Sequence, residues 1–303
     1  MKAMALPSNV YDVVGEIEKD THRGARELTV VALEGLRRSI KQFQASNEQE
    51  LTGFLLTAAR AFAQARPSMI SITNSMSTVV YDVLRHAVVQ GGLRECVLHM
   101  IDEQLTRLEK AFGNVISNAA NLVKHNSTVI TCSYSSTVLE TLIGIGRTGR
   151  SFKVLALPSP SLNESIEYGV LMCERLHDAG IRAAVIGEEM IEKHVRFVDI
   201  ALVGADSILP DGSVINGSPT LRLARESSNC NKQFCVASET WKINPLPLLD
   251  IKPPIEKGME RIPSDLVTTF ATEDGLIAPK DICSYARKFS KRLRAIQDEW
   301  RLG

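Results

Sequence analysis

Five short apolar runs after residue 124, each followed by a helical stretch, constrain the fold of this chain more than any other feature. The runs are Thr128–Cys132, Lys153–Leu157, Ala183–Ile186, Ile200–Val203 and Phe234–Ala237. Short strands alternating with crossover helices of about 15 to 20 residues are typical of βαβ units, which form parallel sheets covered on both faces. Such sheets bind ligands outside the carboxyl ends of their strands. Functional side chains are therefore expected at those ends.

The first part of the chain has a different pattern. From Val10 to about Leu122 apolar residues recur at helical spacing, and Arg66-Pro67 interrupts them. Two of the expected helices cover 73–90 and 93–122. We predict a helical N-terminal domain over residues 1–122, followed by a Rossmann-like parallel α/β domain over residues 123–303 that carries most of the ligand site.

Composition argues against several classes of protein. Lys+Arg and Asp+Glu both number 35, whereas a nucleic-acid-binding protein is usually basic. No apolar run approaches the roughly 18 residues of a membrane span, and the N-terminal segment does not resemble a secretory signal. The six cysteines are scattered, without a CxxC pair or a histidine cluster. We expect a cytoplasmic protein with reduced thiols, no metal or cofactor, and no direct nucleic-acid or membrane partner.

The first apolar run ends in a hydroxyl-rich turn over residues 131–137 that includes Ser135 and opens a helix. Small hydroxyl residues at such a turn cap the helix and leave backbone NH groups facing any anion placed there. Phosphate binding is one interpretation of this turn. Simple helix capping explains each residue equally well.

Charged residues follow two later runs. Asp206 ends the fourth run, just before an Asp211-Gly212 signal for a hairpin-like excursion. A carboxylate at a strand end can act as a general acid or base if its surroundings adjust its pKa, although aspartate also caps many turns. Glu239 and Lys242 follow the fifth run, so a second carboxylate and an ammonium group are expected at the same edge.

The helical pattern is interrupted at residues 20–25, where Arg23 and Gly24 occur. Arginine matches phosphate geometry in a bidentate manner, and glycine allows close approach of the backbone. The alternative is an ordinary turn between helices with a solvated arginine.

These motifs together resemble the initiation factor 2B alpha/beta/delta superfamily. The resemblance spans about residues 20–279 and rests on Val203–Asp206 with the stretch to Asn216, on Ala237–Lys242, on Ile262-Pro263, and on Thr272–Gly275 with Pro279. The superfamily contains regulatory subunits of the translation factor, ribose-1,5-bisphosphate isomerase and methylthioribose-1-phosphate isomerase. The resemblance implies a phosphorylated sugar or nucleotide as ligand. Together with the apolar segment 241–254, it implies a homodimer or higher homo-oligomer associating through the α/β domain.

The motifs Arg23-Gly24-Ala25 and Arg66–Ser71 are most similar to the ribose-1,5-bisphosphate isomerase branch and its archaeal neighbours. This similarity implies that the first motif helps to hold a substrate phosphate. It also implies that Asp206 transfers protons in an aldose-ketose isomerisation. Arg66, Asn216 and Thr220 are expected among the substrate contacts.

Three segments depart from the isomerase pattern. The isomerases place a catalytic cysteine after a Thr-His pair, whereas here Ser133 occupies the cysteine slot and Cys132 the histidine position. Residues 157–160 lack the acidic and basic substrate-binding residues that the isomerases have there. Gly217-Ser218-Pro219 replaces a loop that usually contains a lysine and a glycine, and Pro219 has no backbone NH that could bind a phosphate. Three functions stay open: a ribose-1,5-bisphosphate-type isomerase, an isomerase for another phosphorylated sugar, and a non-catalytic regulatory or assembly subunit.

The displaced cysteine gives a specific expectation. In an active isomerase the acid must be Cys132, brought in by a backbone shift, or Ser133, or a water. A serine hydroxyl is a poor acid compared with a thiol. Because side chains alternate along a strand, Cys132 should point away from the direction of Ser133 unless the chain has already turned. We expect Cys132 to be buried in the core.

Overall fold

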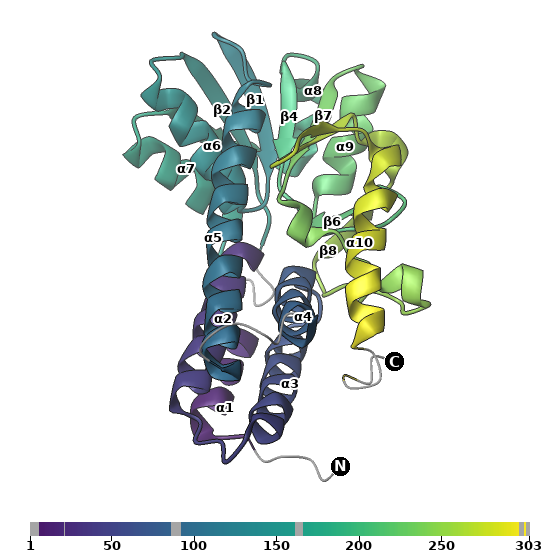
Figure 1. Cartoon of the computed structure of the whole chain (residues 1–303). Helices are drawn as coiled ribbons and strands as arrows, with labels where there is room; N and C mark the ends of the chain where they lie inside the picture. Colours follow the sequence, from purple (N-terminus) through teal and green to yellow (C-terminus); the bar gives the residue numbers. More distant parts are fainter. Residues whose placement is uncertain (1–5, 21, 86–91, 161–165, 297–299, 301–303) are drawn as a thin grey trace. The chain divides into compact units, whose positions relative to one another are not determined.

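The computed structural model describes residues 6–20, 22–85, 92–160, 166–296 and 300 (Figure 1). The chain divides into two compact units. The first comprises residues 1–109, 244–254 and 286–303, and the second comprises residues 110–243 and 255–285.

The first unit is helical, and the predicted helical character of the N-terminal region is confirmed. It contains α1 (Ser8–Lys19), α2 (Ala25–Gln42), α3 (Glu48–Ala65), α4 (Ile70–Arg85), the first part of α5 (Leu93–Ala120), the 3-10 turn Leu246–Leu249 and most of α10 (Ile282–Ala295). Local signals set the boundaries: Asn47 caps α3 by accepting a hydrogen bond from the Glu50 backbone NH, and Pro67 follows the end of α3. The predicted helix over 73–90 begins earlier, at Ile70, and its last five residues lie outside the described part of the chain.

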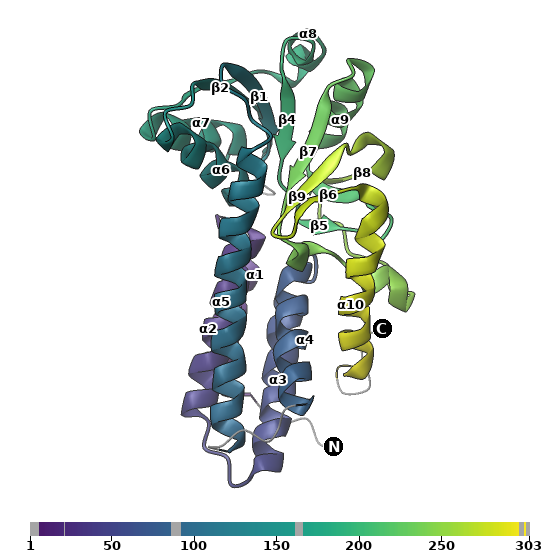
Figure 2. The same ribbon diagram turned by 45° about the horizontal axis from the view of Figure 1, so that its top comes forward.

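The second unit is built on a seven-stranded sheet with the order β10-β9-β7-β4-β1-β2-β3 (Figures 1 and 2). All neighbouring strands run parallel except β9 and β10. The strands are β1 (Ser127–Cys132), β2 (Phe152–Leu157), β3 (Arg182–Val185), β4 (Ile200–Val203), β7 (Gln233–Ala237), β9 (Thr269–Thr272) and β10 (Gly275–Ile277). The five predicted strands are confirmed, and β9 and β10 extend the sheet beyond them.

Helices cover both faces of this sheet. The last part of α5, α6 (Ser136–Arg147) and α7 (Tyr168–Asp178) bury one face, where Val129, Leu142 and Met172 share a core. On the opposite face α9 (Thr220–Asn229) packs against β4 and β7, next to the short helix α8 (Ile191–Val195). The crossover helices are shorter than predicted, with 12 residues in α6, 11 in α7 and 10 in α9. Each still spans the short strand beneath it, because those strands have only four to six residues.

A second, antiparallel sheet lies in the same unit and consists of β5 (Ser207–Ile208), β6 (Val214–Gly217) and β8 (Met259–Ile262). The excursion predicted at Asp211-Gly212 is the β5–β6 hairpin. Gly212 has φ 81°, and a Cβ there would lie 2.7 Å from the Pro279 carbonyl oxygen, so both the turn and the packing require glycine.

Two negative findings apply to the described residues. None of their helices is both long and apolar enough to cross a membrane. No disulfide joins the six cysteines, all of which lie in the described part of the chain.

Candidate functional site

The turn after β1 opens the site. The chain turns at Ser133, whose φ of 65° lies in the left-handed region. Ser135 then caps α6, because its hydroxyl accepts a hydrogen bond from the Val138 backbone NH at 3.3 Å. The helix-opening turn is present as predicted, and capping already accounts for the Ser135 hydroxyl.

Gly217, at the end of β6, brings three segments together. A Cβ on Gly217 would lie 3.0 Å from Ser133 Oγ and 3.1 Å from Ser159 Oγ, which follows β2. Cys132 Sγ lies 3.9 Å from the Gly217 carbonyl oxygen. Strand alternation alone would separate Cys132 from Ser133, but the left-handed turn intervenes, and both side chains lie beside Gly217.

The thiol of Cys132 is fully buried. Burial raises the pKa of Cys132 to about 12; a hydrogen bond with Thr220 opposes the rise, and the negative charge of Glu260 adds to it. The thiol is therefore protonated and withdrawn from solvent at neutral pH, in agreement with the expected burial.

Asn216 and Thr220, both predicted to contact the substrate, form a hydrogen bond with one another. Asn216 Nδ2 donates to Thr220 Oγ1 at 3.0 Å, and Thr220 Oγ1 donates to the Gly217 carbonyl oxygen at 2.6 Å. Ser159 Oγ donates to the Ser218 carbonyl oxygen at 2.6 Å. These bonds give the turn between β6 and α9 one defined shape.

The end of β4 contacts the cap of α6. A Cβ on Gly204 would lie only 2.4 Å from Ser135 Oγ, so this position requires glycine. Two residues later Asp206 donates its backbone NH to the Ile215 carbonyl oxygen at 3.0 Å. Asp206 is thus placed at the carboxyl end of β4 and beside the hairpin, as the sequence predicts.

A buried polar cluster follows β7 and β9. Lys242 Nζ lies 3.6 Å from Glu239 Oε2, and both side chains are less than a tenth exposed. Glu239 Oε1 accepts a hydrogen bond from Thr137 Oγ1 at 3.4 Å, in the first turn of α6. Burial raises the pKa of Glu273, and the negative charge of Glu239 adds to the rise. Hydrogen bonds from Thr240 oppose it. This edge therefore combines the carboxyl groups of Glu239 and Glu273 with the ammonium group of Lys242.

The two N-terminal motifs lie together within the helical unit. Arg23 Nε lies 2.8 Å from Asp20 Oδ2, Arg23 Nη2 lies 2.5 Å from Glu16 Oε1, and these hydrogen bonds raise the pKa of Arg23. Arg66 Nη1 donates to the Asp20 carbonyl oxygen at 2.6 Å. The guanidinium group proposed for a phosphate is therefore engaged by two resident carboxylates.

The glycine and alanine of the first motif begin a helix. Gly24 is the N-cap of α2, and its backbone NH donates to Glu27 Oε2 at 3.0 Å. Ala25 is the first residue of α2 and is buried. Both residues fulfil a structural role in the helical unit.

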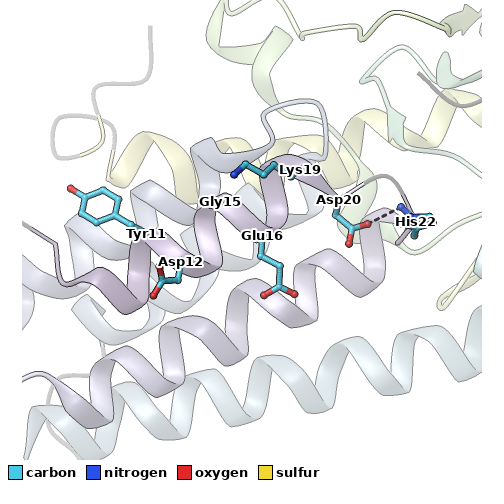
Figure 3. A pocket seen from close by; sticks show the side chains of 7 residues that line it. All are labelled: Tyr11, Asp12, Gly15, Glu16, Lys19, Asp20 and His22. Carbon is cyan, nitrogen blue, oxygen red and sulfur yellow. Dashed lines mark hydrogen bonds between the residues drawn. The ribbon is translucent and has the colours of Figure 1, made fainter. Parts of the chain in front are cut away.

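A pocket of about 600 Å³ lies along α1 beside this motif (Figure 3). Its lining consists of Tyr11, Asp12, Gly15, Glu16, Lys19, Asp20 and His22. Burial raises the pKa of Asp20, but hydrogen bonds from Arg23 and from the His22 backbone NH outweigh that effect and lower it. With three carboxylates in its lining, the pocket suits a phosphate less well than the sequence motif indicates.

Three polar residues of the sheet edge were not singled out from the sequence, namely Ser159, Glu260 and Glu273, whereas Thr137 lies in the predicted hydroxyl-rich turn. Ser159 follows β2, a predicted strand, so its position at a strand end was a usable signal, whereas Glu273 follows β9, which was not predicted. Glu260 acts through contacts between distant segments, for which no local signal exists. In the described part of the chain no group of three or more His, Cys, Asp or Glu side chains could hold a metal ion.

Comparisons with known proteins agree with this architecture. The Initiation factor 2 subunit family model matches residues 21–268. The chain is 28% identical over 230 residues to the ribose 1,5-bisphosphate isomerase of Haloferax volcanii, covering 76% of this chain and 69% of the relative. Among solved structures, the translation initiation factor eIF-2B of Pyrococcus horikoshii OT3 is similar with a TM-score of 0.75 and 26% identity, covering 91% of this chain and all of that one. A chain of the tetrameric eIF2B-beta2-delta2 complex of C. thermophilum shares the fold, with a TM-score of 0.78, 18% identity, and coverage of 94% of this chain and 95% of that one.

Proposed function

The chain belongs to the Initiation factor 2 subunit family, and from this premise we propose that it binds a phosphorylated sugar or a nucleotide at the carboxyl edge of its seven-stranded sheet. The observation that carries the proposal is the convergence of polar strand ends, with Ser133 after β1, Ser159 after β2, Asp206 after β4 and Glu239 after β7. Parallel sheets bind ligands at this edge. The similarity to a ribose 1,5-bisphosphate isomerase makes phosphorylated sugars the first class to test.

The N-terminus of α6 is the part of this edge best suited to a phosphate. A helix of 12 residues presents first-turn amides and a partial positive charge at its start. Lys242 supplies an ammonium group beside Glu239, 3.6 Å away, and so partly compensates the acidic charge there. The hydroxyl groups of Ser135 and Thr137 lie in the same turn, where the first caps α6 and the second binds Glu239.

Isomerisation is a second candidate, and the position of Asp206 favours it. The reaction requires an acid to open the sugar ring and a proton shift between neighbouring carbons. A fully buried Cys132 with a pKa of about 12 and the hydroxyl of Ser133 are both weak acids for the first step. We therefore favour ligand binding by a non-catalytic regulatory or assembly subunit over a ribose-1,5-bisphosphate-type isomerase.

Thermal shift and calorimetric titration with ribose 5-phosphate, ribose 1,5-bisphosphate, nucleoside monophosphates and unphosphorylated ribose test the proposal. A ligand of the native state raises the melting temperature, so phosphorylated compounds should raise it and ribose should not. Ser135→Asp and Ser135→Asn form a matched pair, because both side chains can cap α6 and only the first adds a negative charge. Ser135→Asp should weaken binding by about tenfold relative to Ser135→Asn. Equal affinities in the pair, or no shift with any phosphorylated compound, would refute the proposal.

We also propose that the chain forms a homodimer or a larger homo-oligomer, with the α/β unit at the interface. Support comes from the fold shared with a chain of a tetrameric complex. The apolar segment 241–254 was expected to contribute, but residues 244–254 belong to the helical unit, and residues 244–246 among them are buried. A monomer at micromolar concentration by light scattering would count against self-association.

A further inference from the structure

Glu260 bridges two segments at the edge of the candidate site. It lies on β8, directly opposite Asn216 on β6. Its Oε1 atom accepts a hydrogen bond from Ser218 Oγ at 3.1 Å, and its Oε2 atom accepts one from the Leu221 backbone NH at 2.8 Å. One carboxylate therefore spans the turn over residues 218–221.

The Leu221 amide belongs to the first turn of α9. The N-cap of this helix is Pro219, which makes no side-chain capping bond. Helix N-termini carry unpaired NH groups and a partial positive charge, and an anion stabilises them. Glu260 supplies that anion from 39 residues further along the chain.

The same turn shapes the candidate site. The Ser218 backbone NH donates to the Gly258 carbonyl oxygen at 2.8 Å, beside the start of β8. On its other side the Ser218 carbonyl oxygen accepts the hydrogen bond from Ser159. Gly217, which directly precedes the turn, lies against Ser133 and Ser159. The position of Gly217 relative to both hydroxyls therefore depends on how the turn is held.

We propose that Glu260 is a positioning residue whose carboxylate takes the place of a bound anion at the N-terminus of α9 and fixes the turn that the ligand contacts. This inference rests on the proposed ligand site. It also assigns the phosphate of the ligand to another position, because a resident negative charge already occupies the start of α9 and would repel a second one.

Chemical rescue of a Glu260→Ala variant tests the proposal. The variant loses two charge-assisted hydrogen bonds, so the affinity for ribose 5-phosphate should fall by about tenfold, which is about 1.4 kcal/mol. The melting temperature should fall by on the order of 3 °C. Sodium acetate should restore both quantities, since its carboxylate can occupy the vacated place, whereas sodium chloride at equal ionic strength should not.

Glu226→Ala is the matched control, because it removes a carboxylate near the other end of α9, where Glu226 Oε2 accepts a 3.3 Å bond from Asn229 Nδ2. Neither salt should affect the control differently from the wild type. Glu260→Gln keeps the shape without the charge, and it should weaken affinity less than Glu260→Ala and show no acetate effect. If Glu260→Ala does not fold, the affinity of Glu260→Gln for ribose 5-phosphate takes its place as the measurement.

The outcomes separate the inference from the proposed function. Unchanged affinity in both Glu260 variants, or equal effects of acetate and chloride on Glu260→Ala, would overturn the positioning role. If the wild type binds no phosphorylated compound, the proposed function fails. The acetate-specific recovery of the melting temperature then still decides whether a carboxylate at the start of α9 holds the turn.

Discussion

Iodoacetamide should leave Cys132 almost unmodified in the folded protein. The thiolate is the reactive form, and burial raises the pKa of this thiol from an ordinary 9.0 to about 12. Three pH units correspond to about a thousandfold fewer thiolates at a given pH below 9. The side chain is also fully buried, which slows the reaction further because the reagent must wait for local opening.

Peptide mass spectrometry can measure the alkylation rate of each cysteine in one sample. Cys230 and Cys283 are partly exposed and serve as internal references, and urea-unfolded protein shows the intrinsic reactivity of Cys132. Modification of folded Cys132 within about tenfold of the reference rates, with protection by ribose 5-phosphate, would refute the reasoning and identify an activated thiol.

The same shift has a consequence for alkaline stability. The folded-state pKa of Cys132 is raised, so the unfolded chain loses this proton first. The stability associated with the protonated thiol is fully present below pH 9 and is lost as the pH rises from about 9 towards 12. In that window the free energy of unfolding should fall more steeply for the wild type than for Cys132→Ala, as measured by urea titration.

Three further predictions concern other parts of the site. Asp206→Asn should abolish any conversion of ribose 1,5-bisphosphate measured by NMR, because the amide cannot exchange the proton. The circular dichroism spectrum should stay unchanged, and loss of folding would instead indicate a turn-capping role. Gly217→Ala should weaken ribose 5-phosphate binding by about tenfold in calorimetry, because its methyl group would lie 3.0 Å from Ser133 Oγ and 3.1 Å from Ser159 Oγ. The double variant with Ser159→Gly should regain part of the lost affinity. Asp20→Asn should cost about 1 kcal/mol of unfolding free energy at pH 7. Because the pKa of Asp20 is lowered in the folded state, this cost should persist above pH 3.8 and disappear as the pH falls below it in urea titrations.

The elements of the fold were largely predictable because their signals are local. Val129 and Ile130 lie in a short, mostly β-branched segment whose residues are all buried, as in a strand covered on both faces. Asp211-Gly212 marks the β5–β6 turn through the left-handed conformation that glycine adopts easily. The strand β8 gave no comparable signal, because it pairs only with β6 and has two charged residues, Glu260 and Arg261, at its centre.

The contacts of the site depend on packing that local patterns do not encode. Thr137 and Glu239 are 102 residues apart, and Ser159 and Ser218 are 59 apart. The left-handed turn at Ser133 also has no sequence signal, because serine seldom adopts positive φ without a surrounding structure that imposes it. Sequence reasoning therefore located the strand ends correctly and could not determine how Cys132 and Ser133 are oriented there.

The helical unit is discontinuous in sequence, since residues 244–254 and 286–303 return to it after the α/β unit has been traversed. During synthesis, residues 1–109 must therefore wait while the whole intervening stretch is translated, which takes on the order of ten seconds at typical ribosomal speeds. Apolar side chains that those late segments cover stay accessible to chaperones for that interval. Neither unit can be expressed as one uninterrupted piece of the gene, and a truncation before residue 286 removes part of the first unit as well as the end of the chain.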